Sequence, residues 1–399
     1  MALAMPTNQP ELPDHVRRRD FRVIRSGMTA IDQGHTMTIG SLPLERGGVL
    51  PDVEIRYRTW GTLDETGHNA VLVLHALTGD SNAAGDGGWW EPLIGPGRAI
   101  DTDRYFVISS DIIGGCSGST GPTSIDPRTG ETYAMHFPIV TIGDMVNAQR
   151  RLVERLGVTR LVAVGGSIGG YQALEWATRH PDLVSATISI AASGRLSPFG
   201  IATHSEIGRR AIMADPDWRE GDYARFGVFP ASGLAIARMA AMLTYKGREI
   251  MEERFGRSPA SRPSPYAPFG GTYDVEGYLH HQGQSLVQRF DANSYLYLTR
   301  AMDLYDLGGE QGDDHWLRQI AAPLLLVGIR SDWLYPPEEV RVLAAQAVAL
   351  GRDAAYLELD SPHGHDAFLK EWTALVGMLQ RFLDRVRPGE EREGGMIAQ

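Results

Sequence analysis

An apolar run that breaks into glycines around one serine is the feature that most constrains this chain. Residues 161–164 have the pattern of a buried strand, and residues 171–177 have that of a helix. Between them stands Gly165-Gly-Ser-Ile-Gly169, which fits G-x-S-x-G, the turn that holds a nucleophilic serine above strand ends. A helix beginning just after Ser167 would add partial positive charge where an oxyanion forms. The stretch predicts a nucleophile elbow; the plainer alternative is a glycine-rich turn that binds a phosphate or no ligand.

Charge and cysteine content narrow the class of protein. The formal net charge of −11 argues against a nucleic-acid or membrane-surface partner, so local arginines must hold any anionic ligand. Cys116 is the only cysteine, which excludes an intramolecular disulfide and a cysteine-based metal cluster. No stretch approaches the ~18 apolar residues of a membrane span. Residues 1–20 carry prolines and charges instead of the apolar centre of a signal peptide, so we expect a cytoplasmic protein.

Strand-like and helical patterns divide the chain into a core and an insertion. Continuous apolar runs, as at 70–75 and 183–191, suit the central strands of an α/β protein covered on both faces. From about residue 195 the pattern turns helical, and strand character resumes at 323–328, which favours an inserted lid over a separate helical domain. The expected organisation is a loose leader at 1–20, a first core part at 21–194, a helical lid at 195–320, a second core part at 321–386, and a polar tail at 387–399.

Two residues downstream complete a candidate triad with Ser167. In α/β-hydrolases the order along the chain is Ser, then Asp or Glu, then His. Asp332 follows the resumed strand, and His365 follows the next strand, so both fall on loops at the same edge of a parallel sheet. Taken singly, Asp332 could be a turn or N-cap aspartate and His365 a surface histidine. Their order and spacing together favour the triad.

Other chemistries have weaker support. His363 is the nearest competitor to His365, and Cys116 lacks a nearby His-Asp pair, so we interpret it as a packing residue. The glycine-rich loops lack the lysine of a P-loop, and no His-Glu pair has zinc-binding spacing, so we expect no metal and no tightly bound cofactor. An oxyanion hole needs two backbone N–H groups, and those of Leu77 and Ile168 are the candidates.

Several further motifs carry a resemblance to a known family. The chain resembles the homoserine O-acetyltransferases in the elbow with its following helix and in these stretches: Tyr57-Arg-Thr-Trp-Gly61, His75-Ala-Leu-Thr-Gly79, Gly114-Gly-Cys-Ser-Gly-Ser-Thr-Gly-Pro122, Asp215-Pro-Asp-Trp218, Asp291-Ala-Asn-Ser-Tyr-Leu296 and Gly364-His-Asp-Ala-Phe368. The resemblance spans about residues 20–385. It implies an α/β-hydrolase fold, a mostly parallel sheet flanked by helices with an inserted helical lid, and a homodimer formed through the lid helices.

The resemblance also implies an activity. Members transfer an acetyl group from acetyl-CoA, as co-substrate, to the hydroxyl of L-homoserine for methionine biosynthesis, by double displacement through the serine. By matching motifs, Arg238 pairs with the substrate carboxylate and Asp366 with its ammonium. Thr78 and Tyr245 are also expected at the substrate-binding site. A planar guanidinium suits a carboxylate; the plainer alternatives are an inter-helix arginine for Arg238 and a helix-start aspartate for Asp366.

Some positions depart from the family pattern. Ile168 and Tyr171 stand where methionine is usual, and Asp111 where asparagine is usual. Succinyl-using relatives tend to carry arginine at the position of Leu334, so leucine favours acetyl. The alternatives left open are a serine O-acyltransferase, a succinyl-CoA-dependent homologue, an esterase or thioesterase on the same triad, and a catalytically silent binding module.

Overall fold

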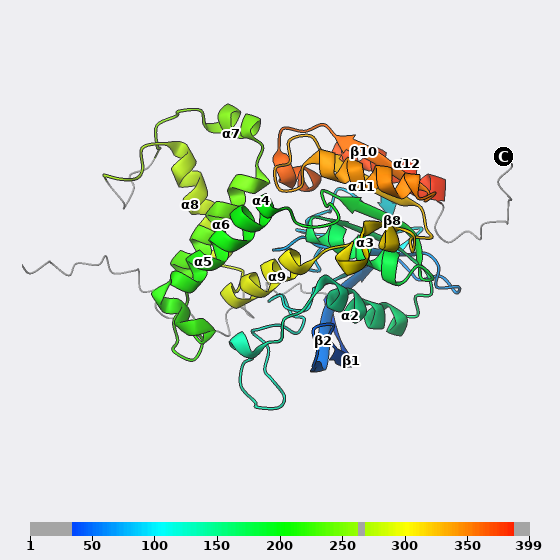
Figure 1. Ribbon diagram of the computed structural model, residues 1–399, viewed down its shortest axis with the longest axis horizontal. Helices are drawn as coiled ribbons and strands as arrows, with labels where there is room; N and C mark the ends of the chain where they lie inside the picture. The colour runs from blue at the N-terminus through cyan, green and yellow to red at the C-terminus, as the bar shows by residue number, and fades with distance from the viewer. Residues whose placement is uncertain (1–33, 262–267, 387–399) are drawn as a thin grey trace, which may run out of the picture.

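The computed structural model describes residues 34–261 and 268–386 of the protein (Figure 1). The leader expected at 1–20 and the tail expected at 387–399 lie outside the described residues. The described chain forms a sheet-centred body with a group of helices beside it.

An eight-stranded sheet in the order β1-β2-β6-β3-β7-β8-β9-β10 organises the body. Only the pairs β1–β2 and β2–β6 are antiparallel, and every other neighbouring pair is parallel. The strands are β1 (His35–Pro43), β2 (Val49–Trp60), β3 (Ala70–Leu74), β6 (Phe106–Ser110), β7 (Leu161–Gly166), β8 (Val184–Ile190), β9 (Leu324–Ile329) and β10 (Ala354–Leu359), with a separate short pair β4 (Ile94–Gly95) and β5 (Ile100–Asp101). The α/β-hydrolase fold class is thereby confirmed.

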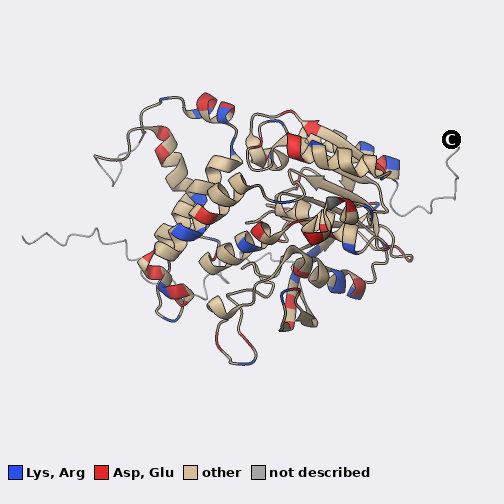
Figure 2. Cartoon of the chain, in the orientation of Figure 1, with Lys and Arg blue, Asp and Glu red and all other residues tan. Residues whose placement is uncertain are grey.

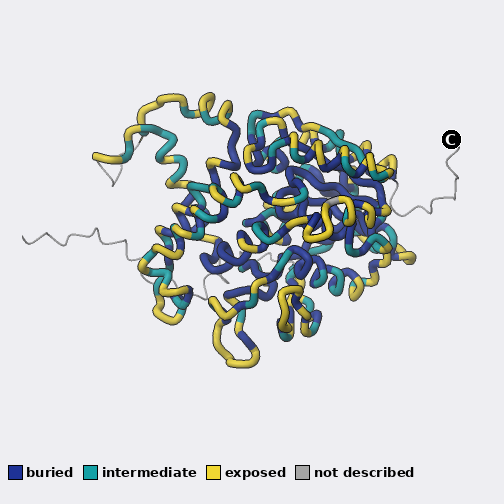
Figure 3. The backbone as a smooth tube through the Cα atoms, viewed as in Figure 1, coloured by how far each residue is buried: buried dark blue, intermediate teal, exposed yellow. Residues whose placement is uncertain are grey.

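Helices cover both faces of the sheet. Successive residues of a strand point to opposite faces, so Leu72 packs with α2 and α3 whereas Val71 and Val73 pack with α12. Because both faces are covered, the strands form the buried centre of the molecule (Figure 3). The covering helices are α2 (Ile142–Arg155), α3 (Ile168–Arg179), α11 (Pro337–Ala349) and α12 (Trp372–Val386).

A second group of helices lies between β8 and β9 in the chain, to one side of the sheet (Figure 1). We refer to these helices, residues 198–317, as the lid. They are α4 (Pro198–Gly200), η3 (Ile201–Glu206), α5 (Ile207–Ala214), η4 (Pro216–Gly221), α6 (Ala231–Tyr245), α7 (Arg248–Phe255), α8 (Asp274–Val287), α9 (Ala292–Leu304), η5 (Gly309–Gln311) and α10 (Asp313–Leu317). Acidic and basic residues are interspersed along α7, whereas the charged residues of α5 are both arginines (Figure 2). Helix α6 packs between α5 and α8.

The lid differs in one place from the sequence pattern, which is helical from residue 278 to residue 306. The structure breaks this run into α8 and α9, and Asp291 is the N-cap of the second helix. Its carboxylate accepts a hydrogen bond of 2.8 Å from the N–H of Ser294 and another from the hydroxyl of Tyr223. An aspartate cap satisfies a free N–H at a helix start, so a buried carboxylate here ends one helix and begins the next. Arg289 lies in the resulting link.

Within 34–261 and 268–386, no helix is both long and apolar enough to cross a membrane. In the same ranges no group of three His, Cys, Asp or Glu residues is arranged to hold a metal ion.

Candidate active site

Ser167 occupies a strained turn between β7 and α3. Its backbone has φ 61° and ψ −127°, a conformation that a residue with a side chain rarely adopts. The flanking glycines make room for it: a Cβ on Gly165 would lie 2.5 Å from the carbonyl oxygen of Gly169, and a Cβ on Gly169 would lie 2.1 Å from that of Leu74. The spacing of the two glycines in G-x-S-x-G is therefore a steric requirement of the turn. The turn leaves Ser167 at the carboxyl end of β7, the first position before a helix.

Asp332 and His365 form a buried hydrogen-bonded pair. The Nδ1 atom of His365 lies 2.7 Å from Oδ2 of Asp332. The other oxygen of Asp332 accepts from the N–H groups of Leu334 and Tyr335, at 2.8 and 3.0 Å, which orients the carboxylate. Because Nδ1 donates to the carboxylate, Nε2 is the atom left to act as a base. That Nε2 atom is buried and has no hydrogen-bond partner among the described residues.

The short helix that carries His365 packs directly against the elbow. His365 lies in η6 (Gly364–Leu369), and the ring of Phe368 from the same helix is 5.6 Å from the imidazole. A Cβ on Gly166 would meet the Phe368 ring at 2.6 Å, so this contact requires a glycine before Ser167. No hydrogen bond joins Ser167 to His365 within the described residues. Such contacts often tighten only when substrate binds.

Lid residues cover the imidazole of His365. The ring of Tyr245, the last residue of α6, stacks on it at 5.7 Å with an interplanar angle of 25°. The guanidinium of Arg238, two turns earlier, lies 5.1 Å from the centre of the Tyr245 ring. His204 Nε2 is 2.6 Å from the Tyr245 hydroxyl. Two of the residues proposed for substrate binding, Arg238 and Tyr245, thus lie beside His365, and His204 is an addition that the sequence did not indicate.

Asp366, proposed for the substrate ammonium, already has a cationic partner. Its Oδ2 atom lies 2.6 Å from Nζ of Lys246, and the two side chains are 19% and 7% exposed. Lys246 directly follows Tyr245, so the end of α6 supplies both the stacked ring and the ammonium group. A ligand ammonium at Asp366 must share the carboxylate with Lys246 or displace it. No local sequence signal marks this long-range pair.

The loop that follows β3 is held by the buried side chain of His75. The N–H of Ile112 donates to His75 Nε2 at 3.2 Å, so the proton is on Nδ1, which donates to the carbonyl of Ala76 at 2.7 Å. Burial lowers the pKa of His75, which keeps this neutral form. The same carbonyl also accepts from the N–H of Gly79 at 2.9 Å. In a planar trans peptide the N–H points away from the C=O, so these bonds orient the N–H of Leu77.

The second candidate oxyanion donor is Ile168. As the first residue of α3 it has no acceptor for its N–H within the helix. The positive end of the helix dipole lies at the same place. Leu77 and Ile168 are both buried, so water is largely excluded from these donors. Thr78, next to Leu77, has its carbonyl and hydroxyl occupied by Arg289, at 2.6 and 3.3 Å.

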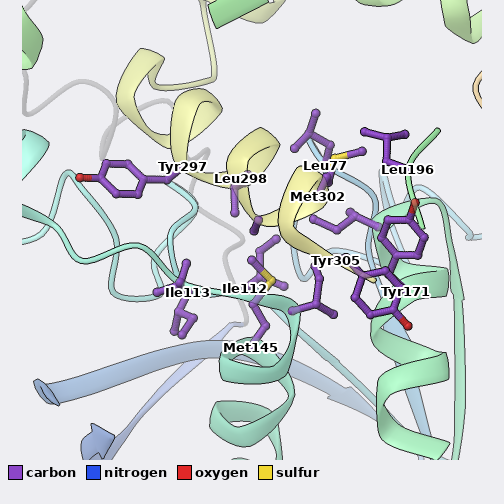
Figure 4. Packing of buried hydrophobic residues seen from close by; sticks show 14 of the residues in the cluster. Leu77, Ile112, Ile113, Met145, Tyr171, Leu196, Tyr297, Leu298, Met302 and Tyr305 are labelled. Carbon is purple, nitrogen blue, oxygen red and sulfur yellow. The ribbon is translucent and has the colours of Figure 1, made fainter. Parts of the chain in front are cut away.

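The departures from the family pattern lie around this site. The ring of Tyr171 packs on Tyr305 at 4.2 Å and on Tyr335 at 5.4 Å, and Tyr335 in turn contacts His365. Tyr171 is therefore one ring removed from the imidazole, in the cluster that also holds Leu77 (Figure 4). Burial, reinforced by the charge of Asp80, raises the pKa of Asp111 well above its usual range. Asp111 accepts a hydrogen bond of 2.5 Å from the N–H of Ser81.

Cys116 and His363, the alternatives to Ser167 and His365, lie in surroundings that do not suit a nucleophile or a base. Burial raises the pKa of the Cys116 thiol, which opposes formation of a thiolate, and its sulfur accepts from the N–H of Asp291 at 3.3 Å. His363 Nε2 lies 3.9 Å from a carboxylate oxygen of Glu371. Neither residue has the buried aspartate partner that His365 has.

Comparison with known proteins agrees with this architecture. A family model described as the alpha/beta hydrolase fold matches residues 69–371. The chain is 46% identical over 372 residues to a homoserine O-acetyltransferase from Carboxydothermus hydrogenoformans. The matched residues cover 90% of this chain and 97% of that protein. The chain belongs to the homoserine O-acetyltransferase family. As a family member it is an acyltransferase, and the resemblance noted from its motifs is confirmed.

The solved structures that are similar to this chain include both transferases and esterases. The crystal structure of homoserine O-acetyltransferase from Bacillus anthracis superposes with a TM-score of 0.82 at 28% identity, covering 88% of this chain and 98% of that one. Esterase E22 superposes with a TM-score of 0.80, also at 28% identity, covering 88% of this chain and 99% of that one. The family scaffold is thus similar to proteins that transfer an acyl group and to proteins described as esterases.

The buried His204 predicts a loss of stability in acid. Burial, with the charges of His365 and Arg238, lowers the pKa of His204 to about 3 from an ordinary value of 6.5. Between these values the unfolded chain binds a proton that the folded chain does not, so the free energy of unfolding decreases as the pH falls from 6.5 towards 3. We expect His204→Gln to show a smaller decrease between pH 7 and pH 5 in urea unfolding. If the free energy of unfolding decreases equally in the variant and the parent, His204 is not the source of the acid sensitivity.

Proposed function

We propose that the protein transfers an acetyl group from acetyl-CoA to the hydroxyl of L-homoserine, as a step of methionine biosynthesis. The observation that carries the proposal is the buried Asp332–His365 pair, with a free Nε2, packed against the elbow of Ser167. The relatives named homoserine O-acetyltransferase support the choice of acceptor and acyl group.

The first half-reaction acylates the enzyme. His365 Nε2 takes the hydroxyl proton of Ser167 as its oxygen attacks the thioester carbonyl, and Asp332 stabilises the imidazolium that forms. The N–H groups of Leu77 and Ile168 bind the oxyanion. When the tetrahedral intermediate collapses, the carbon–sulfur bond breaks and CoA leaves as the thiol with the proton from His365. Acetyl-Ser167 remains.

The second half-reaction transfers the acetyl group to the acceptor. His365 takes the proton of the homoserine hydroxyl, whose oxygen attacks the carbonyl of acetyl-Ser167, and the same oxyanion donors act again. Collapse breaks the ester bond to the enzyme and returns the proton to Ser167. O-acetylhomoserine leaves, and the enzyme is restored.

Charged residues around the site support an acceptor that carries a carboxylate and a donor that is an anion. In a chain with a net charge of −11, Arg238 and Lys246 gather beside His365, and Arg289 lies on the adjacent loop. Among the described residues, no carboxylate lies within ion-pair distance of Arg238, so its guanidinium is available to a ligand carboxylate. Leu334, fully buried and apolar, offers no cation for the extra carboxylate of a succinyl group. These features favour acetyl-CoA and an amino-acid acceptor.

A mass measurement tests both half-reactions. We expect acetyl-CoA to add one acetyl group to Ser167, and L-homoserine, but neither L-serine nor buffer, to remove it rapidly. Ser167→Ala should stay folded and form no adduct, because it lacks the nucleophile. Intact-protein mass spectrometry follows the adduct. Equally fast loss in buffer would identify an esterase, the candidate that similarity to esterase E22 favours, and discharge by L-serine would identify a serine acyltransferase.

Arg238 tests the choice of acceptor. We expect Arg238→Gln to raise the KM for L-homoserine by about 10- to 100-fold, the value of a lost charge-assisted hydrogen bond. Acetylation of Ser167 by acetyl-CoA should continue. Steady-state kinetics measure the first effect and intact mass the second. Arg210→Gln on α5 is the matched control, since that side chain is 75% exposed and pairs with Glu206. An unchanged KM in Arg238→Gln would withdraw the carboxylate assignment.

We also propose that the protein works as a cytoplasmic homodimer formed through the lid. The lone cysteine is consistent with a reducing compartment. Large apolar side chains are exposed on the lid, where a monomer would leave them in water. They are Phe199, Ile207, Met213, Phe226, Ile236, Leu243 and Phe269.

Leu243 tests the dimer. It is 58% exposed on α6, and Ile236, which is 50% exposed, lies two turns earlier on the same face. We expect Leu243→Glu to convert the dimer to a monomer, because a charge would be buried in an apolar interface. Analytical ultracentrifugation measures the mass. A parent protein that sediments as a monomer would overturn the proposal.

A further inference from the structure

Arg289 connects the lid to the loop that carries a candidate oxyanion donor. It lies in the link between α8 and α9, and its Nη1–H donates to the carbonyl of Thr78 at 2.6 Å. A second donor, Nη2–H, lies 3.3 Å from the hydroxyl of the same threonine. These groups are 211 residues apart in sequence. Among the described residues, no carboxylate is within ion-pair distance of Arg289, so Thr78 is its hydrogen-bonded partner.

Two peptide groups lead from this guanidinium to the N–H of Leu77. The carbonyl of Thr78 shares its peptide plane with the N–H of Gly79, which donates to the carbonyl of Ala76 at 2.9 Å. That carbonyl shares its own plane with the N–H of Leu77. Because C=O and N–H point in opposite directions across a trans peptide, the two groups line up head to tail. The chain of donors runs from Arg289 through Gly79 to Leu77.

Such an arrangement strengthens the last donor. Hydrogen bonds in a chain polarise one another, by about 10–30% for each bond. A cation that donates to the first carbonyl makes the N–H of Gly79 a better donor, and this in turn polarises the N–H of Leu77. The orientation of the loop also matters, since an oxyanion donor acts only when it is aimed at the developing charge. His75 holds the carbonyl of Ala76 from the core side.

We propose that Arg289 is a positioning residue of the oxyanion hole, acting through the peptide groups of Thr78–Gly79 and Ala76–Leu77. The lid then contributes to both half-reactions without touching the reacting atoms. The inference rests on the proposed acetyl-Ser167 mechanism, and it assigns Arg289 a role other than binding a substrate anion. It follows that loss of the guanidinium lowers the rate of acylation even for a donor that has no negative charge.

A neutral acetyl ester distinguishes a positioning role of Arg289 from a role in binding a substrate anion. p-Nitrophenyl acetate carries neither phosphate nor carboxylate, and its attack by Ser167 releases p-nitrophenolate as the acetyl-enzyme forms. We expect Arg289→Gln to lower the burst rate constant by about tenfold, a fraction of the 10²- to 10³-fold cost of deleting an oxyanion donor. The ester concentration that gives half-maximal rate should stay the same. Arg289→Lys should recover part of the rate, because one N–H donor can still reach the carbonyl of Thr78.

Controls keep the outcomes separate. Arg210→Gln should have the same burst rate constant as the parent. Circular dichroism checks that the Arg289 variants are folded. Thr78→Val removes only the weaker hydroxyl contact, so its burst rate constant should fall less than that of Arg289→Gln. If Arg289→Gln acylates at the parental rate, and only its KM for L-homoserine or acetyl-CoA rises, Arg289 binds substrate and the inference is overturned. If the parent forms no acetyl-enzyme from either donor, the proposed function fails, and the inference with it.

Discussion

The positive φ of Ser167 is the constraint on which the rest of the site depends. A residue with a side chain is held there because Gly165 and Gly169 allow the strand, the turn and the helix to approach within distances that any Cβ would prevent. The same turn brings the N-terminus of α3 to the nucleophile and leaves the N–H of Ile168 without a helical acceptor. The positions of the proposed nucleophile and of one candidate oxyanion donor thus follow from a single backbone conformation.

The remaining polar groups of the site are held by long-range contacts. Asp332 orients His365, His75 holds the carbonyl of Ala76, and Arg289 reaches the same loop from the lid. Buried polar groups are stable only when their hydrogen bonds are satisfied. The Nε2 atom of His365 is among the buried side-chain atoms that have no partner within the described residues, and it is the atom that the proposed chemistry uses.

Much of this architecture could be predicted because it is encoded in short, local patterns. The apolar run at 354–359 coincides with β10, and the apolar residues spaced along one helical face at 142–156 coincide with α2, residues 142–155, which has a capping box at Thr141 and Asp144. The break at Asp291 was not predicted because a helical pattern continues across it, and the hydrogen bond from the N–H of Ser294 to its carboxylate shows that the aspartate is a cap.

The sequence by itself determined the order of elements, the turn at Ser167 and the residue types of a triad, since spacing and periodicity act within a few residues. The polar partner that each charged side chain meets is set by the tertiary structure. The pairing of Asp366 with Lys246 joins residues 120 apart, and that of Arg289 with Thr78 joins residues 211 apart. No periodicity encodes such contacts, because they arise only when the lid folds back over the carboxyl ends of the strands and brings those groups together.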